Sequence, residues 1–596
     1  MTPQTFGAHL LPAGGARFSL WAPDAQRAVL VLDGRPVDTQ VEDGWYLAEA
    51  ASARPGQRYV WRIDDRLDVP DPASRYQPEG VHGPSELLDP QVYTWQDAAW
   101  RGRPWQDAVI YELHLGTFTP SGSYLGAIER LDALAELGVT AIELMPLAEF
   151  GGLRNWGYDG VLPYAPTAAY GRPEELKQLV DAAHARDLMV LIDVVYNHFG
   201  PDGNYLHTYA GRFFNADRHT PWGAAIDFRQ PQVREFFIGN ALYWLDEYHF
   251  DGLRLDAVHA IEDPSDEHLL DELARRVHAG PARMRTIHLV LENDANQAHL
   301  LEREAGGAPR AYVAQWNDDL HHVLHHLLTG ESDGYYADYA AAPHAALGRA
   351  LTQGFVYQGE PSPFRDGTRR GTASAHLPPE AFVGFMQNHD QVGNRALGER
   401  LAELAPAPAV EAAAAVLLLA PSPPLLFMGE EMDARTPFFF FCDFEGELAE
   451  AVREGRRGEF ARFAAFADAG ARARIPDPNA PETFAACRLD WDHAQTPQGR
   501  ARHDLYRRLL ALRRRCVLPF VQHIAPGTAR YAAPEGAALH AWWPGRDGAR
   551  LELLANLSPQ PRPAPVPPFS QPLHLQGQQP EHHTLPPWCV IWSLQA

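Results

Sequence analysis

The chain has few cysteines, and no two of them lie close together. Its 596 residues include only 4 Cys. Zinc sites and disulfide-stabilised small domains both need closely spaced cysteines. The spacing therefore disfavours both, and we expect a protein without a metal or cofactor whose thiols are reduced and mostly buried. The four positions are Cys442, Cys487, Cys516 and Cys589.

Long apolar runs are also absent. The longest, around Ala412 to Leu419, is far shorter than a helix that crosses a bilayer. The opening stretch MTPQTFGAHLLPAGG lacks the basic segment and the continuous apolar segment of a secretory signal. We therefore expect a cytoplasmic protein that does not bind a membrane.

Basic residues are fewer than acidic ones. Lys and Arg number 51 against 76 Asp and Glu, which gives a formal net charge of −25. This excess of acid would repel the phosphates of nucleic acids and anionic lipids. We expect a neutral or cationic small molecule as the partner, and a monomer or weak homo-oligomer.

The chain divides into three regions with different sequence patterns. Residues 1–100 hold short aromatic or β-branched runs such as RFSLWAP and YVWRI between turns, which predicts an N-terminal β-sandwich. Residues 101–515 alternate apolar runs with long Ala/Leu/Glu/Arg segments, which predicts parallel strands joined by helices. Residues 516–596 return to short strands and Pro-rich turns, which predicts a small C-terminal β-domain.

The middle region contains eight candidate strands. They are AVIYELHLG, VTAIELMP, LMVLIDVVYNH, GLRLDAV, IHLVLEND, AYVAQWND, AFVGFMQNHD and PPLLFMGEE. Runs of this kind suit strands covered on both faces. Eight strands, with no G-x-G-x-x-G turn after the first, favour a (β/α)8 TIM barrel over an open doubly wound sheet.

Charged side chains stand at the ends of several of these strands. Asp256, Glu292 and Asp390 end three of them, and a barrel places catalytic groups at its carboxyl end. Arg254 shares a strand face with Asp256, because side chains alternate with a period of two. A single such pair is typical of a structural salt bridge, but three carboxylates would be costly to bury for structure alone.

Two carboxylates in different surroundings suit the cleavage of a glycosidic bond. One must be ionised to attack the anomeric carbon, and the other must hold a proton for the leaving oxygen. Arg254 favours the charged form of Asp256, whereas Glu292 ends the apolar run HLVLE. We therefore predict Asp256 as the nucleophile and Glu292 as the general acid/base.

Four stretches, in this order, resemble the α-amylase superfamily of glycoside hydrolases. They are DVVYNH (193–198), GLRLDAVHA (252–260), LEND (291–294) and FMQNHD (385–390). The resemblance implies the same two roles, a third carboxylate at Asp390 that binds sugar hydroxyls, and retention through a covalent glycosyl-enzyme. It also implies that Arg254 contacts Asp193, and that His198, His389 and Tyr158 line the subsite of the cleaved sugar.

Other stretches are most similar to superfamily members that cut the α-1,4 bond next to the terminal 1,1-linked pair of maltooligosyltrehalose and release trehalose. They include AEFGGLRNWGYDG (148–160), AQWNDDLHH (314–322) and QNHDQVGNR (387–395). The alternatives are a glycogen branching or debranching enzyme, and a non-catalytic glucan-binding protein. The N-terminal sandwich resembles a carbohydrate-binding module, but a buttressing role is equally consistent with its sequence.

Several residues have two interpretations. Asp318 contacts substrate or caps a helix, and each candidate tryptophan stacks on sugar or packs in the core. Asn388 follows a strand that ends at the cleft, and we predict that it binds substrate. The tryptophans are Trp156, Trp222 and Trp316. The histidines of DLHHVLHH lack the Glu of a metal-binding H-E-x-x-H helix, so we expect that helix to face the cleft. We interpret Glu430 and Glu431 as a structural cluster at a strand end, and FFFF (438–441) as cleft wall or core.

Overall fold

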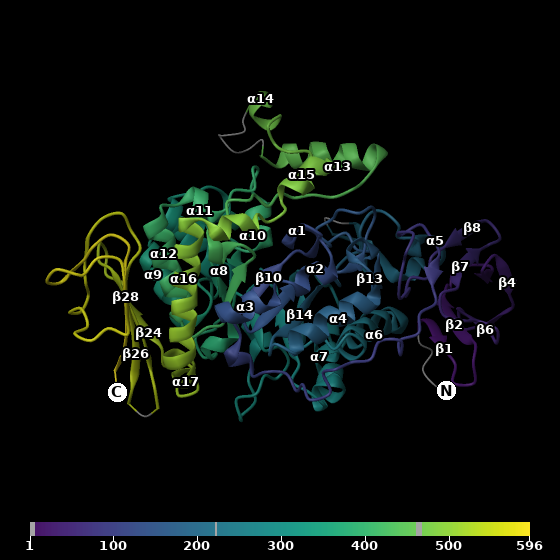
Figure 1. Cartoon of the computed structure of the whole chain (residues 1–596), viewed down its shortest axis with the longest axis horizontal. Helices are drawn as coiled ribbons and strands as arrows, with labels where there is room; N and C mark the ends of the chain where they lie inside the picture. Colours follow the sequence, from purple (N-terminus) through teal and green to yellow (C-terminus); the bar gives the residue numbers. More distant parts are fainter. Residues whose placement is uncertain (1–5, 221–222, 461–467, 547, 596) are drawn as a thin grey trace.

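The computed structural model describes residues 6–220, 223–460, 468–546 and 548–595 (Figure 1). Two antiparallel sheets form its N-terminal part, and together they confirm the predicted β-sandwich. The first sheet has the order β1-β2-β6-β5, with bounds Gly7–Leu10, Ala16–Trp21, Trp45–Ala50 and Thr39–Glu42. The second has the order β4-β3-β7-β8, with bounds Arg35–Val37, Ala28–Leu32, Arg58–Ile63 and Leu67–Val69, and β9 (Ser85–Glu86) pairs with β7.

Eight parallel strands close into a barrel in the order β10-β11-β14-β17-β18-β19-β22-β23. Their bounds are Ile110–Leu113, Ala141–Leu144, Met189–Val194, Gly252–Leu255, His288–Leu291, Ala314–Trp316, Phe382–Phe385 and Pro424–Phe427. Each strand lies within one of the eight segments predicted from the sequence, so the TIM-barrel prediction is confirmed.

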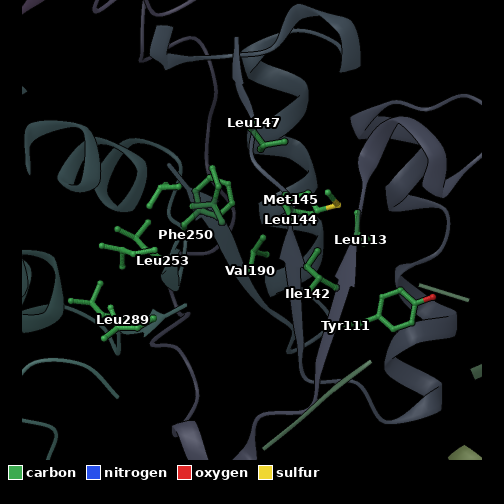
Figure 2. Close-up of a cluster of buried hydrophobic side chains, with 14 of the residues drawn as sticks. Tyr111, Leu113, Ile142, Leu144, Met145, Leu147, Val190, Phe250, Leu253 and Leu289 are labelled. Atoms are coloured by element: carbon green, nitrogen blue, oxygen red, sulfur yellow. The ribbon is translucent and has the colours of Figure 1, made fainter. Parts of the chain in front are cut away.

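The alternation of side chains along these strands is also as expected. Leu253 packs on the outer side of the barrel with residues such as Ile142, Val190 and Leu289 (Figure 2). A separate apolar cluster fills the barrel interior, and it includes Met189, Leu191, Val290, Trp316 and Phe385. Because Arg254 alternates with the outward leucines, its side chain points into the barrel.

Helices surround the barrel, and their ends follow from local sequence. The helix α4 (Pro173–His184) begins with proline and two glutamates, and the carboxylate of Glu175 accepts a hydrogen bond from the Arg172 N–H at 3.0 Å. The helix α3 (Leu131–Leu137) ends at Gly138, whose φ of 109° suits glycine. The other long helices in the barrel layer are α6 (Pro231–Glu247), α7 (Leu269–Ala279), α8 (Asp318–Thr329), α12 (Ala407–Leu419) and α16 (Pro497–Leu512).

The C-terminal sheet packs against the barrel through α9 (Pro343–Gln353) and α12. Its order is β24-β25-β26-β30-β28, with bounds Arg530–Ala532, Leu539–Pro544, Arg550–Asn556, Cys589–Gln595 and His574–Gln576. The indole of Trp592 on β30 donates a hydrogen bond to the carbonyl of Ala415 at 2.9 Å. Apolar residues line α12 on all sides because it lies between the barrel and this sheet (Figure 1).

Two further predictions are tested by the fold. The four cysteines are unpaired thiols, buried except for Cys516, which is half-buried. Among the described residues, no helix has the length and apolar character needed to cross a membrane.

Candidate active site

One cavity, of about 600 Å³, lies at the carboxyl end of the barrel and holds the three predicted catalytic carboxylates. Asp256 directly follows β17 and Glu292 directly follows the neighbouring strand β18. Asp390 lies in the first turn of α10 (His389–Gly393), which follows β22. Other predicted residues line the same cavity, namely Trp156, Tyr158, His198, Arg254, Trp316, Asp318, Asn388 and His389.

Asp256 is held by a buried guanidinium. Arg254 donates to Asp256 Oδ1 at 2.6 Å and to both carboxylate oxygens of Asp193 at 2.9 and 2.8 Å. The ring of Trp316 lies 4.2 Å from the same guanidinium. Charge-assisted hydrogen bonds of this kind stabilise an ionised carboxylate. The expected pairing of Arg254 with both aspartates is present.

Glu292 is in a different electrostatic setting. One of its carboxyl oxygens accepts a hydrogen bond from the Ala257 N–H at 2.7 Å. Burial raises the pKa of Glu292 well above its ordinary value, and although Arg254 opposes this shift, the negative charge of Asp256 adds to it. A raised pKa keeps the carboxyl protonated, as an acid catalyst requires.

Backbone strain lies between these two carboxylates. Ala257 has a φ of 42°, in the left-handed region that residues with a Cβ seldom adopt. This conformation directs the Ala257 N–H at Glu292, so the residue after Asp256 positions the neighbouring carboxyl. Strained residues of this kind concentrate at functional sites.

Asp390 and Asp318 are two further carboxylates at the cavity. Asp390 is exposed to the cleft. The surrounding protein partly desolvates its carboxyl group, and this desolvation and the charge of Asp256 raise its pKa, although His389 opposes the shift. Burial raises the pKa of Asp318 to about 7. The N-cap of α8 is Asn317 rather than Asp318, so Asp318 stands in the first turn and lines the cavity.

His389 is oriented by a buried glutamate that sequence reasoning missed. Glu112, on β10, accepts hydrogen bonds from the backbone N–H of His389 at 2.9 Å and from its ring Nδ1 at 2.5 Å. Burial lowers the pKa of His389, but the charge of Glu112, its hydrogen bond and the charge of Asp390 together outweigh burial, so the net pKa is raised. Arg254 is identified in the sequence as a charged residue between two apolar residues of a strand. Glu112 and, on β11, Glu143 have the same pattern.

Tyr158 and His198 form the adjacent wall. The Tyr158 hydroxyl donates to Asp193 at 2.5 Å, and its ring stacks on that of His389 with centroids 5.1 Å apart. His198 Nε2 lies 3.0 Å from the Tyr158 carbonyl, and burial lowers the pKa of this histidine. Asp193 is not in the cavity lining, and it acts on the site only through Arg254 and Tyr158.

Some of the candidate aromatic residues line the cavity and others pack in the core. Trp156 stacks on Phe438 with centroids 5.5 Å apart and donates to the Phe439 carbonyl at 2.9 Å, although its edge reaches the cavity. Within FFFF, Phe438 and Phe441 are core residues, whereas Phe440 lines the cavity, so both interpretations hold for different members. Trp222 lies outside the described residues.

Two predictions about the surrounding helices are settled by hydrogen bonds. The Asn388 side chain caps α10 by accepting from the Gln391 N–H at 2.9 Å. In α8, His322 lines the cavity, but His325 lies 2.7 Å from Glu331, and His321 lies 2.6 Å from the Met386 carbonyl. Among the described residues, no group of three or more His, Cys, Asp or Glu is arranged to hold a metal ion.

One wall of the cavity comes from a loop that sequence reasoning did not use. Arg370 lies 3.2 Å from Asp294 and 2.5 Å from Asp319, and Arg365 also pairs with Asp294. The run FRDGTRR (364–370) was the available signal, but a cluster of arginines in a loop does not indicate which carboxylates it will meet.

Comparison with known proteins decides the family. The family described as "Alpha amylase, catalytic domain" matches residues 91–216, and a domain of unknown function, DUF3459, matches residues 526–592. A malto-oligosyltrehalose trehalohydrolase from Deinococcus radiodurans is 44% identical over 516 residues, which cover 86% of this chain and 83% of the relative. The chain belongs to the malto-oligosyltrehalose trehalohydrolase family.

Solved structures agree with the fold. The crystal structure of a protein described as "Putative alpha Amylase", from Salmonella typhimurium, has a TM-score of 0.95 and 44% identity, and the match covers 100% of both chains. A pullulanase from Paenibacillus barengoltzii, complexed with maltotetraose, has a TM-score of 0.72 at 20% identity, which supports the fold alone. The predicted resemblance to the α-amylase superfamily is confirmed.

Proposed function

We propose that the chain is a retaining glycoside hydrolase that cleaves the α-1,4 bond next to the terminal trehalose unit of maltooligosyltrehalose. It releases trehalose and a maltooligosaccharide. The names of the relatives support this substrate. One observation carries the chemistry: Asp256 and Glu292 face one cavity from adjacent strand ends, and only Asp256 is paired with a guanidinium.

In the first step Asp256 attacks the anomeric carbon of the sugar that precedes trehalose. Arg254 donates a hydrogen bond to the attacking carboxylate and directs it into the cavity. The bond to the trehalose oxygen breaks, and Glu292 gives its proton to that oxygen. Trehalose then leaves, and the maltooligosaccharide remains bound to Asp256 as a covalent ester.

In the second step water replaces trehalose. Glu292, now ionised, takes a proton from this water, whose oxygen attacks the same anomeric carbon and releases Asp256. Two inversions at one carbon give net retention. The roles of Asp390, His389, Tyr158 and His198 are to bind the hydroxyls and the ring face of the sugar under attack, because these side chains surround the same cavity.

The experiment that tests this function compares three substrates. They are maltopentaose carrying a terminal trehalose unit, plain maltopentaose, and amylose. We expect release of trehalose from the first at a rate well above the cleavage of the other two. Equal or faster cleavage of plain maltopentaose would contradict the trehalose assignment.

The same assay separates the second candidate, a branching or debranching enzyme with the same catalytic residues. A branching enzyme passes the glycosyl group to a glucan hydroxyl rather than to water, so new α-1,6 bonds would form from amylose. A debranching enzyme would cleave such bonds in a branched glucan. We expect neither product.

Three further features are proposed on the same basis. The chain acts in the cytoplasm, as a monomer or weak homo-oligomer. It divides into a sandwich at residues 1–100, a catalytic barrel at 101–515 and a C-terminal β-domain at 516–596. The positions of the sheets support this division.

A further inference from the structure

Asp319, in the first turn of α8 (Figure 1), is a buried carboxylate that the proposed mechanism does not use. It is 0% exposed and, unlike its neighbour Asp318, it does not line the catalytic cavity. A carboxylate removed from water is costly unless protein donors surround it. The donors around Asp319 show which parts of the molecule this charge holds together.

One oxygen of Asp319 joins two segments that are far apart in the sequence. Oδ2 accepts a hydrogen bond at 3.1 Å from the side chain of Asn296, in the turn that follows the acid/base. The same oxygen accepts from the N–H groups of Val356 and Tyr357 at 2.7 and 3.1 Å. These two residues begin the loop that carries Arg370. The loop and the turn are therefore fastened to one atom.

The other oxygen reaches the same turn through Arg370. Oδ1 of Asp319 accepts from Arg370 Nη1 at 2.5 Å and from the Tyr339 hydroxyl at 2.6 Å. Arg370 in turn donates from Nε to the backbone carbonyl of Asp294 at 2.8 Å, and its Nη2 lies 3.2 Å from Asp294 Oδ1. Two chains of hydrogen bonds thus join Asp319 to the turn, one at Asn296 and one at Asp294.

The turn itself, at residues 293–296, begins directly after Glu292. The Asn296 N–H closes it by donating to the Asn293 carbonyl at 3.1 Å. Asn296 has a φ of 50°, in the left-handed region, and such a conformation persists where the surrounding structure holds it. A change in this turn moves the end of the backbone segment that carries the acid/base.

Glu292 is fixed by its backbone more than by partners of its side chain. Its N–H donates to the Leu255 carbonyl at 2.9 Å, and its carbonyl accepts from the Val258 N–H at 3.1 Å. Its carboxyl accepts from the Ala257 N–H and otherwise faces the cavity. The segment after β17 therefore supports Glu292 on one side, and the turn supports it on the other.

We propose that Asp319 is a positioning residue for the general acid/base. It holds the turn after Glu292 and, through the turn, the direction in which this carboxyl gives its proton. An acid catalyst must lie within hydrogen-bond distance of the leaving oxygen, so a small displacement slows proton transfer. The role of Glu292 rests on the proposed function, whereas the hydrogen bonds of Asp319 do not depend on it.

The first test compares two leaving groups in single-turnover kinetics of the full-length protein. Trehalose must receive a proton as it leaves maltopentaose that carries it, whereas fluoride leaves α-maltotriosyl fluoride as a stable anion and needs little proton donation. Asp319→Asn keeps the size of the side chain and removes the charge that binds Arg370. We expect trehalose release to slow about tenfold, the effect of losing one hydrogen bond between charged groups. Fluoride release should change less than about twofold, since it depends little on the acid.

Asp263→Asn is the matched control. The Asp263 side chain is also 0% exposed and paired with an arginine, Arg234, but it precedes α7 and does not line the cavity. Both Asn variants should unfold at a lower temperature than the wild type, and only Asp319→Asn should slow trehalose release. Equal slowing of trehalose and fluoride release in Asp319→Asn would overturn the proposal, because general damage to the cavity affects both leaving groups.

A double-mutant cycle shows whether Asp319 acts through Glu292. Adding Asp319→Asn to Glu292→Gln should cause no further loss in the rate of trehalose release, since Gln has no proton to position. A further loss of about tenfold would overturn the proposal, because Asp319 would then act by another route. Near-native rates in Glu292→Gln alone would contradict the proposed function, and the positioning role with it.

Two provisions keep the cycle decisive. If thermal unfolding shows that Asp319→Asn is not folded, Asn296→Gly takes its place with the same expectations. This change suits the left-handed backbone and removes the donor to Asp319 Oδ2. If the wild type cleaves plain maltopentaose as fast as the trehalose-ended substrate, the trehalose assignment alone fails. The cycle then applies unchanged to plain maltopentaose, whose leaving oxygen needs the same proton.

Discussion

Two groups of carboxylates stand at strand ends of the same barrel, and only one of them lines the catalytic cavity. Glu292 lies after β18 at the cavity, whereas Glu430 and Glu431 lie after β23 and are 5% and 3% exposed. Burial raises the pKa in both groups, to about 7 for Glu430 and Glu431. A raised pKa therefore does not identify a catalytic acid in this molecule.

The difference between the groups lies in what the carboxyl oxygens meet. Glu430 accepts hydrogen bonds from Tyr506 at 3.0 Å and Gln387 at 3.3 Å. Glu431 accepts from the Tyr111 hydroxyl at 3.2 and 3.1 Å. Glu292 is held by one backbone N–H and otherwise faces the cavity. The strand-end cluster is structural, as the sequence interpretation had it, because donors of the protein occupy its oxygens.

Glu292→Gln is the substitution for which we expect the largest effect. The amide cannot give a proton to the leaving oxygen, so we expect kcat to fall by about 10³-fold. Sugar binding should persist, because size and polarity are retained. Trehalose release measured by chromatography gives the rate, and calorimetry gives the affinity.

The pH profile sharpens this prediction. Because the pKa of Glu292 is raised, the wild-type rate should fall as pH rises through that pKa and the proton is lost. This alkaline limb should be absent from the residual activity of Glu292→Gln. A variant with near-native rates, or with the wild-type limb intact, would show that another group is the acid.

A smaller effect is expected from Glu112→Gln, whose carboxylate is hydrogen-bonded to His389 and whose charge also contributes to the raised pKa of Asp390. Removing this negative charge should lower the pKa of His389, because Glu112 is the main group that keeps that pKa raised against burial. We expect kcat/KM to fall about tenfold, the size that corresponds to the loss of one hydrogen bond to a charged group. The pH profile of kcat/KM and the titration of the His389 ring by NMR measure the two changes.

The matched control for Glu112→Gln is Glu143→Gln on the next strand. Glu143 is buried, with neither carboxyl oxygen hydrogen-bonded to a described residue, and burial raises its pKa well above the ordinary value. Since burial favours the neutral form of this glutamate, the change to Gln should alter the local charge less than Glu112→Gln does. An equal shift of the pH profile in both variants would mean that His389 responds to packing and not to the charge of Glu112.

The sequence predicts the barrel and its three central carboxylates for a simple physical reason. Charges inside otherwise apolar strands are costly, so Arg254 and Asp256 stand out within GLRLD, and strand ends of a barrel converge. The same reasoning applied to YEL and IEL would have found Glu112 and Glu143. A criterion based on strand ends does not select these two residues, because both lie inside strands.

Other parts of the site depend on tertiary structure that local patterns do not encode. Arg365 and Arg370 reach Asp294 from a distant loop, and no spacing in the sequence relates them. His325 has the helical spacing of a cleft-facing residue, but Glu331, from the turn after α8, binds it instead. Which partner satisfies a buried polar group is decided by how the loops close.

The smallest expected effect is that of Glu430→Gln, and it tests the structural side of the comparison. Kinetics should change less than about twofold, because Glu430 is enclosed by Tyr506 and Gln387 and does not line the cavity. Stability should change instead. The pKa of Glu430 rises from an ordinary 4.5 to about 7 on folding, so the folded state holds this proton more tightly than the unfolded state.

The sign of the pH dependence follows from this shift. The contribution of Glu430 to stability is complete below pH 4.5 and is lost as pH rises through about 7. Gln carries no proton to lose, so urea unfolding of the variant should depend less on pH between 4.5 and 7. The remaining slope comes from Glu431 and from other buried carboxyls with a raised pKa, such as Asp318 and Asp193. A loss of activity as large as that of Glu292→Gln, with stability unchanged, would place Glu430 in the chemistry and remove the distinction between the two groups.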